Sequence, residues 1–269
     1  MAPLEGIGYP AAAMSAPNPA DAAPDGGETT HFGYRIVPEA EKPALVQGVF
    51  EDVARRYDLM NDLMSLGVHR LWKRALFERM QPRAAATLLD LGGGTGDIAF
   101  GWRARGGGET IVCDLTQAML SVGRDRAIDR NVAGIEWVCG DAENLPFPSS
   151  RFDTCSIAFC LRNVTHIDAA LSEARRVLRP GGRFFCLEFS KVAIPSLAKL
   201  YDRYSFTMLP LLGRLVAHNR DAYQYLAESI RRFPDQDDLA ARMTRAGFDM
   251  VRYSNFSGGI VALHTGWRL

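Results

Sequence analysis

A chain of 269 residues is long enough for one large domain, and its 47 % hydrophobic and 23 % charged residues are ordinary for a globular protein. Lysine and arginine together number 31, as do aspartate and glutamate, so the formal net charge is zero. This balance argues against nucleic acid as the main ligand, because neutralising phosphates takes a basic excess or a basic stripe, although a local basic patch is still compatible with it.

About the first thirty residues are rich in Ala, Pro, Gly and Asp and contain no Lys or Arg. They lack the basic start of a secretory signal and the arginines of a mitochondrial transit peptide. No run in the chain approaches the roughly 18 apolar residues of a membrane-spanning helix. We therefore expect residues 1–40 to be a disordered tail and the protein to be cytoplasmic.

Residues 41–269 are expected to form a single domain that opens with helices. Between about Pro43 and Met80, apolar residues recur three and four positions apart, which is the spacing of one helix face. The positions that define this pattern are Val46, Val49, Phe50, Val53 and Tyr57. We expect residues 41–82 to form an N-terminal helical region that contains no strand.

From Thr87 onward, short apolar runs alternate with helical patterns. The predicted strands are Thr87–Leu91, Thr110–Leu115, Ile135–Gly140, Phe152–Phe159 and Arg183–Phe189, followed by a closing pair at Asp249–Phe256 and Gly259–Leu269. Apolar strands that alternate with helices indicate a parallel sheet covered on both faces. Residues 193–232 interrupt the alternation, and we interpret them as a helical insertion over the active-site edge of the sheet, before the last two strands.

The five cysteines include no CxxC pair, and four of them lie within or beside the apolar runs. We interpret them as small buried hydrophobic residues in a reducing compartment, and we expect no metal site. They stand at Cys113, Cys139, Cys155, Cys160 and Cys186.

A glycine-rich loop, LGGGTGD, follows the first predicted strand. Ligands of open α/β sheets bind at the carboxyl ends of strands, and Gly92, Gly94 and Gly96 would let the backbone approach a ligand closely. The spacing is GxGxG, with Asp97 where the dinucleotide fingerprint needs its last glycine, which disfavours an NAD-dependent oxidoreductase. A tight turn without a ligand is the alternative interpretation.

Acidic residues end the next two strands. Asp114 lies about twenty residues beyond the glycines, where a carboxylate can accept hydrogen bonds from both hydroxyls of a ribose. After the third strand, the segment GDAENLPFP offers Asp141 and Ala142. Each aspartate could instead cap a following helix.

In their order along the chain, these elements resemble the cofactor site of class I S-adenosylmethionine-dependent methyltransferases. The resemblance implies a doubly wound, mostly parallel seven-stranded sheet with an antiparallel last strand, and S-adenosylmethionine as cofactor. It also implies that Asp90 supports the loop and the methionine amine, that Asp141 accepts from the adenine amino group, and that the N–H of Ala142 reaches the ring. The resulting set of cofactor-binding residues is Asp90, Gly92, Gly94, Thr95, Gly96, Asp114, Asp141 and Ala142.

Longer motifs resemble one family within this class. YDLMNDLMSLGVHRLW (57–72) and RVLRPGGRFFCLEFS (176–190) are similar to the two signatures of the ubiquinone/menaquinone biosynthesis C-methyltransferases. FCLRNVTH, YQYLAESIRRFPDQ and the closing GGIVALHTGWRL extend the resemblance from about Val46 to Leu269. It implies carbon methylation of a polyprenylated benzoquinol and, in some members, of demethylmenaquinol. Two positions depart from the family pattern, since Cys160 replaces a frequent glycine and Ala158 a serine.

Arg162 and Asn163 follow the fourth strand, where the methyl acceptor lies in this fold. We hypothesise that Arg162 holds the phenolate oxygen of the quinol, because its guanidinium is always charged, and that Asn163 orients this oxygen or a water. The alternative is that both residues only cap the next helix. Cys160 is not expected to act as a nucleophile, because a hydroquinol ring is already electron-rich.

The 57–72 segment adds two catalytic candidates. Tyr57 could place its ring near the sulfonium in a cation–π contact, and His69 could act as a base, with a structural histidine as the alternative. We expect residues 41–82 to act as a lid over the cofactor and the ring.

The apolar tail of such a quinol suggests that the substrate lies in a membrane. Residues 194–216 have an amphipathic composition suited to peripheral contact at the inner face of the membrane, or to helices packed on the core. Association with other quinone-biosynthesis enzymes or with a second copy is also left open.

A non-catalytic scaffold of a quinone-biosynthesis complex and a class I methyltransferase of another small aromatic substrate both stay open. A nucleic-acid methyltransferase is disfavoured, because FCLRN stands where amino-group methylation of adenine usually shows [DNS]PP[YFW].

Overall fold

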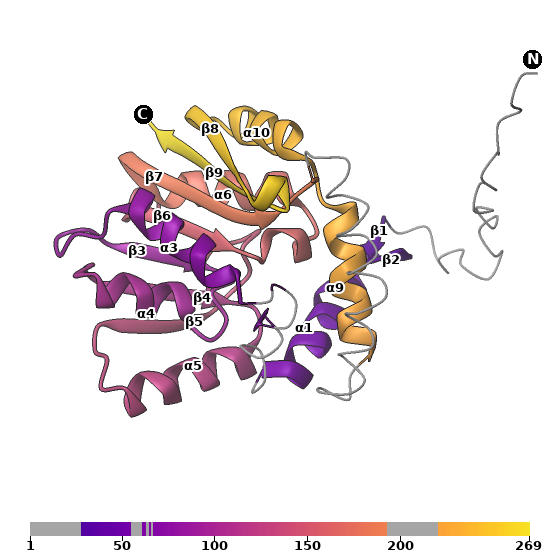
Figure 1. The fold of residues 1–269 in the computed structure, drawn as a ribbon, viewed down its shortest axis with the longest axis horizontal. Helices are drawn as coiled ribbons and strands as arrows, with labels where there is room; N and C mark the ends of the chain where they lie inside the picture. The colour runs from indigo at the N-terminus through magenta and orange to yellow at the C-terminus, as the bar shows by residue number, and fades with distance from the viewer. Residues whose placement is uncertain (1–27, 55–60, 63–64, 66, 193–219) are drawn as a thin grey trace, which may run out of the picture.

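The computed structural model describes residues 28–54, 61–62, 65, 67–192 and 220–269. A seven-stranded sheet with the order β5-β4-β3-β6-β7-β9-β8 forms its centre (Figure 1). Neighbouring strands pair in parallel except β9, which is antiparallel to both β7 and β8. The strands are β3 Leu88–Leu91, β4 Thr110–Asp114, β5 Ile135–Cys139, β6 Phe152–Ala158, β7 Leu178–Phe189, β8 Asp249–Phe256 and β9 Val261–Arg268. The predicted fold class is confirmed.

Helices cover both faces of this sheet. They are α1 Lys42–Val53, α3 His69–Met80, α4 Asp97–Ala104, α5 Gln117–Asp129, α6 Ile167–Val177, α9 Arg220–Arg232 and α10 Gln236–Arg245. Short 3-10 turns lie at η2 Glu39–Glu41, η4 Leu161–Asn163 and η7 Ser257–Gly259. In the described parts of the chain, no helix is both long and apolar enough to cross a membrane.

The alternation of side chains along the strands builds two apolar cores. In β3, Leu88 belongs to the core shared with α1, α3, α4 and α9, whereas Leu89 belongs to the core shared with α6 and α10. In β7, Phe185 belongs to the first of these cores and Phe184 to the second. Successive residues of a strand point to opposite faces, so continuous apolar runs are the pattern expected of a sheet buried on both sides.

Strand β7 begins earlier than its sequence predicts. The expected start was Arg183, after the RPGG sequence, but the strand starts at Leu178, which pairs with Phe152. The register then shifts, and Thr154 pairs with Arg183. The glycines therefore form an irregularity within the strand and do not end it.

Residues 29–38, expected to belong to a disordered tail, instead form an antiparallel hairpin of β1 Thr29–Phe32 and β2 Arg35–Pro38. Tertiary contacts with α9 hold it, since the ring of Phe32 stacks on that of Tyr225 at 4.2 Å and the N–H of Tyr34 donates to Glu228 at 2.9 Å. Figure 1 shows the hairpin beside α9 at one end of the molecule. The expected boundary at residue 40 is therefore wrong for this stretch.

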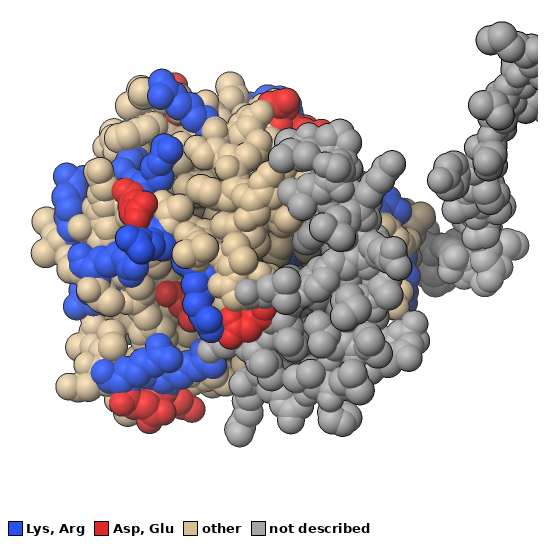
Figure 2. Space-filling model, viewed as in Figure 1, with Lys and Arg blue, Asp and Glu red and all other residues tan. Residues whose placement is uncertain are grey.

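The helices α1 and α3 lie in the region expected to be helical, and the helix α9 lies at the end of the predicted insertion. The rest of the insertion, residues 193–219, lies outside the described part of the chain. On the face drawn in Figure 2, basic and acidic side chains lie next to one another in several places, with uncharged areas between these mixed groups.

Candidate functional site

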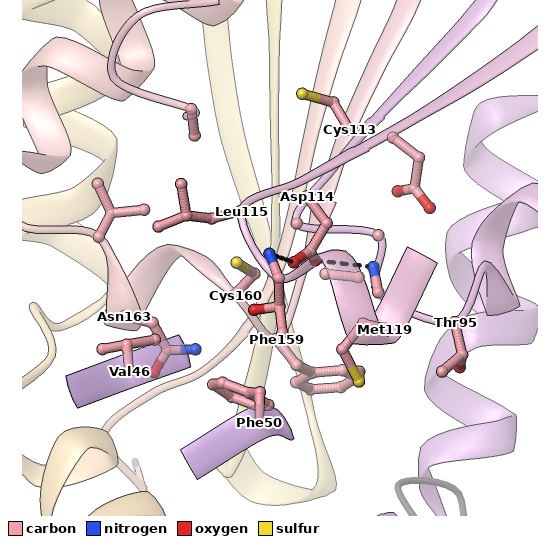
Figure 3. A pocket seen from close by; sticks show the side chains of 18 of the residues that line it. Val46, Phe50, Thr95, Cys113, Asp114, Leu115, Met119, Phe159, Cys160 and Asn163 are labelled. Atoms are coloured by element: carbon pink, nitrogen blue, oxygen red, sulfur yellow. Dashed lines mark hydrogen bonds between the residues drawn. The ribbon is translucent and has the colours of Figure 1, made fainter. Parts of the chain in front are cut away.

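A cavity lies at the carboxyl ends of β3, β4, β5 and β6 (Figure 3). Parallel strands bring these ends to one edge of the sheet, so residues far apart in sequence meet there. Of the predicted cofactor residues, the cavity is lined by Asp90, Gly92, Gly94, Thr95, Asp114, Asp141 and Ala142. Gly96 is the one member of the set outside this lining.

The glycine loop is shaped by close contacts that only glycine permits. Gly92 and Gly94 have φ of 56° and 55°, in the left-handed region. A Cβ atom on Gly92 would lie 2.0 Å from the sulfur of Cys160, and one on Gly96 would lie 2.5 Å from the ring of Trp137. Gly96 therefore serves packing between the loop and β5, whereas Gly92 and Gly94 present backbone to the cavity.

Asp114 ties this loop to the start of α5. Its Oδ2 accepts a hydrogen bond from the N–H of Gly94 at 2.9 Å, and its Oδ1 accepts one from the N–H of Thr116 at 2.8 Å (Figure 3). The N-cap residue of α5 is Thr116, so Asp114 does not occupy the capping position. Burial raises the pKa of the Asp114 carboxyl group, while the two backbone hydrogen bonds oppose this. Each carboxylate oxygen has a second lone pair for a ligand hydroxyl.

Asp141 lies at the next strand end along the sheet. Its Oδ1 accepts from the N–H of Glu143 at 2.9 Å, which forms a local turn after β5. No helix begins in this turn, because the following helical element starts at Leu161, so the helix-cap alternative does not apply. Asp141 and Ala142 both line the cavity.

Asp90 in β3 is fully buried, and its Oδ1 accepts a hydrogen bond from Ser156 Oγ at 2.7 Å. Its Oδ2 has no hydrogen-bond partner among the described residues. Burial raises the pKa of this carboxyl group to about 7, although the hydrogen bond from Ser156 and the charge of Lys73 lower it. An unpartnered buried acceptor is costly, and Asp90 lines the cavity, so the free oxygen suits the ammonium group of a ligand.

Replacing Asp90 by asparagine is expected to stabilise the ligand-free protein above pH 7. The folded wild type keeps the Asp90 proton up to a pH of about 7, whereas an unfolded aspartate releases it near pH 4. The contribution of the protonated Asp90 to the free energy of unfolding is therefore complete below pH ~4. As the pH rises through about 7 this contribution is lost, and the free energy of unfolding falls by on the order of 4 kcal/mol. Urea unfolding between pH 4 and 8 measures the difference, with the exposed Asp125→Asn as control. If the free energy of unfolding of wild type and Asp90→Asn changed with pH in the same way, the prediction would be contradicted.

Arg162 and Asn163, the two candidates for contact with the methyl acceptor, differ in their relation to the cavity. Asn163 lines the cavity, and its Oδ1 accepts from the hydroxyl of Tyr225 at 3.1 Å. Arg162 does not line it, because the guanidinium is turned into the core, where Nη1 lies 2.8 Å from Oε1 of Glu188. The same nitrogen donates to the carbonyl of Phe159. The hypothesis that Arg162 holds the phenolate oxygen is therefore not supported by this geometry.

The two candidates from the 57–72 segment have different outcomes. His69 is buried outside the cavity lining, and its Nδ1 lies 2.8 Å from Ser65 Oγ. Burial, followed by the charge of Lys73, lowers the pKa of His69 to about 4, so its ring is neutral near pH 7 and a weak base. This favours the structural alternative. Tyr57 lies outside the described residues.

The cavity also contains residues that sequence reasoning did not select. Lys73 of α3 and Asp97 of α4 line it as an ion pair at 2.6 Å, and Asn61 lies on the same lining. Apolar side chains from α1, α5 and the loop after β6 complete the wall, namely Val46, Phe50, Met119 and Phe159 (Figure 3). The helical spacing identified Val46 and Phe50 as a buried face, but it carried no signal that the face borders a cavity.

Cys160 lines the same wall beside Gly92. Burial raises the pKa of its thiol well above the usual range, with the charges of Asp114 and Glu188 adding to the effect. The group is therefore protonated, which agrees with the expectation that it is not a nucleophile.

Two solved methyltransferase structures share this fold. An S-adenosylmethionine-dependent methyltransferase from Thermotoga maritima has a TM-score of 0.58 and 19 % identity, covering 82 % of this chain and 99 % of that chain. Phosphoethanolamine N-methyltransferase 2 from Haemonchus contortus, solved with S-adenosylmethionine, has a TM-score of 0.56 and 17 % identity, covering 73 % and 52 %. A sheet of this strand order with a glycine loop at the end of its first parallel strand is the class I methyltransferase fold, and the chain has this fold.

The family follows from closer relatives. The model of the ubiE/COQ5 methyltransferase family matches residues 37–268, and the chain belongs to this family. The ubiquinone/menaquinone biosynthesis C-methyltransferase UbiE of Acidiphilium cryptum is 57 % identical over 243 residues, which are 90 % of this chain and 98 % of that protein. The mitochondrial 2-methoxy-6-polyprenyl-1,4-benzoquinol methylase of Danio rerio is 48 % identical over 279 residues, 90 % of this chain and 85 % of that protein. The cofactor is S-adenosylmethionine.

Proposed function

We propose that the protein methylates a ring carbon of a polyprenylated benzoquinol, of demethylmenaquinol, or of both. One observation carries the proposal: a single cavity joins the acidic strand ends that suit the cofactor to an apolar aromatic wall that suits a quinol ring. Phe50 and Phe159 form part of this wall, and Asn163 is a polar group on the same lining. The names of the two relatives support the same substrate class for this chain.

The described residues fit the cofactor for two reasons. Asp90 Oδ2 is a buried acceptor without a partner among the described residues, and the loop at Gly92 has no room for a larger side chain. We assign the adenine to Asp141 and Ala142, the ribose hydroxyls to Asp114, and the methionine ammonium to Asp90. When bound, S-adenosylmethionine supplies an electrophilic methyl group on its sulfonium. The chain's own contribution is to align this group with the ring carbon and to exclude water.

Asn163 is proposed to act on the acceptor. Because its carbonyl oxygen accepts from Tyr225, its amide N–H groups are the ones free to point at a phenolic oxygen of the quinol. A hydrogen bond to this oxygen favours the electron-rich phenolate form, whose proton passes to solvent. The ring carbon then gains the methyl group, and the proton that it loses moves through water to the phenolate oxygen, which restores the quinol. Arg162 is a positioning residue in this account, since its ion pair with Glu188 fixes the turn that carries Asn163.

Peripheral contact with a membrane is part of the proposal, because a polyprenyl tail resides there. The amphipathic residues 194–216 lie outside the described part of the chain. Tyr34 and Ile36 on the N-terminal hairpin are exposed apolar side chains that would suit such a contact. Association with other quinone-biosynthesis enzymes or with a second copy is a further proposal, which size measurement in the presence of these enzymes would test.

The test is methyl transfer itself. Purified protein is incubated with methyl-labelled S-adenosylmethionine and vesicles that contain either reduced benzoquinol or reduced demethylmenaquinol. We expect mass spectrometry to find the label on a ring carbon of at least one quinol, and the protein to sediment with the vesicles. Label on a phenolic oxygen, or no transfer to either quinol, would contradict the proposed reaction. Transfer without sedimentation would contradict only the membrane contact.

A further inference from the structure

Among the described residues that line the cofactor cavity, Lys73 is the one cation. It projects from α3 and is largely enclosed, with 13 % of its side chain exposed. Its Nζ lies 2.6 Å from Oδ2 of Asp97, the first residue of α4, and both side chains line the cavity. Burial raises the pKa of Asp97, but the neighbouring Lys73 outweighs this and the pKa is lowered overall, so the Asp97 carboxylate is charged at neutral pH.

The charges around this pair are strongly unbalanced. Among the described residues that line the cavity, every charged side chain other than Lys73 is acidic, namely Asp90, Asp97, Asp114, Asp141 and Glu143. Such a lining favours the sulfonium and the ammonium of the cofactor but repels its carboxylate. Within the described lining, Lys73 is therefore the group that can attract that carboxylate.

Lys73 has the hydrogen-bonding capacity for this role. An ammonium group has three N–H donors, and one of them donates to Asp97. Among the described residues, Lys73 makes no second hydrogen bond in the structure. Two donors are thus available on a side chain that is itself largely enclosed, and a charge-assisted hydrogen bond made there is stronger than one at the surface.

The position along the sheet also fits. Asp141 lies just after β5, Asp114 ends β4 and Asp90 lies in β3, and these three strands are neighbours in the sheet. Adenine and ribose placed at the first two residues therefore leave the amino-acid end at the third. The first turn of α4 continues directly from the loop after β3, and α3 packs against α4. The Lys73–Asp97 pair therefore lies at the end of the cavity where a methionine group would be.

We propose that Lys73 binds the α-carboxylate of the cofactor's methionine end and that Asp97 positions the Lys73 ammonium for it. The inference rests on S-adenosylmethionine as cofactor, but not on the identity of the quinol. In this arrangement the ammonium group of the methionine end binds Asp90 and its carboxylate binds Lys73.

The test compares two ligands that differ only in this carboxylate. Calorimetry measures the binding of S-adenosylmethionine and of decarboxylated S-adenosylmethionine to the wild type, Lys73→Met and Lys73→Arg. Arg74→Met is the matched control, because Arg74 lies next to Lys73 on α3 but forms an exposed ion pair with Glu78. If Lys73→Met does not fold, the comparison uses Lys73→Gln and Lys73→Arg.

Lys73→Met is expected to weaken S-adenosylmethionine about tenfold to a hundredfold, as for loss of a hydrogen bond to a charged group, and not to weaken the decarboxylated ligand. Lys73→Arg should restore most of the affinity, and Arg74→Met should match the wild type. Equal weakening of both ligands would overturn the inference, because the lysine would then only support the loop. Unchanged affinity would also overturn it. Failure of the wild type to bind either ligand would overturn the cofactor assignment together with this inference.

Discussion

Asp114→Asn is expected to lower the affinity for S-adenosylmethionine by about 100-fold or more. Two charge-assisted hydrogen bonds to the ribose hydroxyls are lost or weakened, each worth about 1.5–3 kcal/mol. The substitution also disturbs the loop, because an amide has one acceptor oxygen where the carboxylate has two. Gly94 N–H and Thr116 N–H both donate to Asp114, so one of them would face the amide NH₂.

Calorimetry of cofactor binding measures this effect, and the exposed Asp125→Asn on α5 is the matched control with the same chemical change. A circular dichroism spectrum and a melting curve show whether the sheet is intact. An affinity within threefold of the wild type would contradict the ribose assignment. Weakened binding of the control as well would show that the effect comes from overall charge.

Arg162→Met is expected to destabilise the fold by about 3–5 kcal/mol, the range for removal of one partner of a buried ion pair. The side chains of Arg162 and Glu188 are 3 % and 2 % exposed, so the remaining carboxylate would be left charged in the core. Burial already raises the pKa of Glu188, and Arg162 is the main group that opposes this. The double variant Arg162→Met, Glu188→Met should be more stable than Arg162→Met alone, because no buried charge is then unpaired.

Denaturant unfolding and turnover are measured on the same proteins. If Arg162 positions Asn163, the double variant regains stability while kcat stays low, and S-adenosylmethionine affinity is nearly unchanged. A stable Arg162→Met protein that binds the cofactor but has no turnover would instead show that Arg162 reaches the quinol. Asn163→Asp, which removes the amide donors, provides a comparison for loss of acceptor contact without a change in the ion pair.

The sheet could be predicted from the sequence because its signal is local. Each buried strand is a short apolar run bounded by polar or turn residues, and the glycines after Leu91 mark a strand–turn–helix. The N-terminal hairpin has no comparable signal. Its stability comes from Phe32 against Tyr225, a contact between residues far apart in sequence, and its own segment is too short and polar to indicate order.

The residues at the strand ends that line the cavity could be predicted as well, since the topology brings the ends of adjacent parallel strands together and the resemblance to the methyltransferase class singled out the polar residues there. The acceptor side could not. Arg162 and Asn163 are neighbours in a 3-10 turn, where consecutive side chains point about 120° apart, so only one of them faces the cavity. Lys73 lay beyond sequence reasoning because its relation to Asp97 depends on how α3 packs against α4.

The hairpin has a practical consequence for anyone shortening this protein. Phe32 covers the ring of Tyr225, and the Tyr225 hydroxyl in turn holds the carbonyl of Asn163 at the rim of the cavity. A chain shortened to begin at residue 41 would therefore lose the Phe32 ring that packs on Tyr225, the side chain that orients the amide of Asn163. A crystallisation variant should begin no later than Glu28, so that the strand pair and its aromatic anchor are kept.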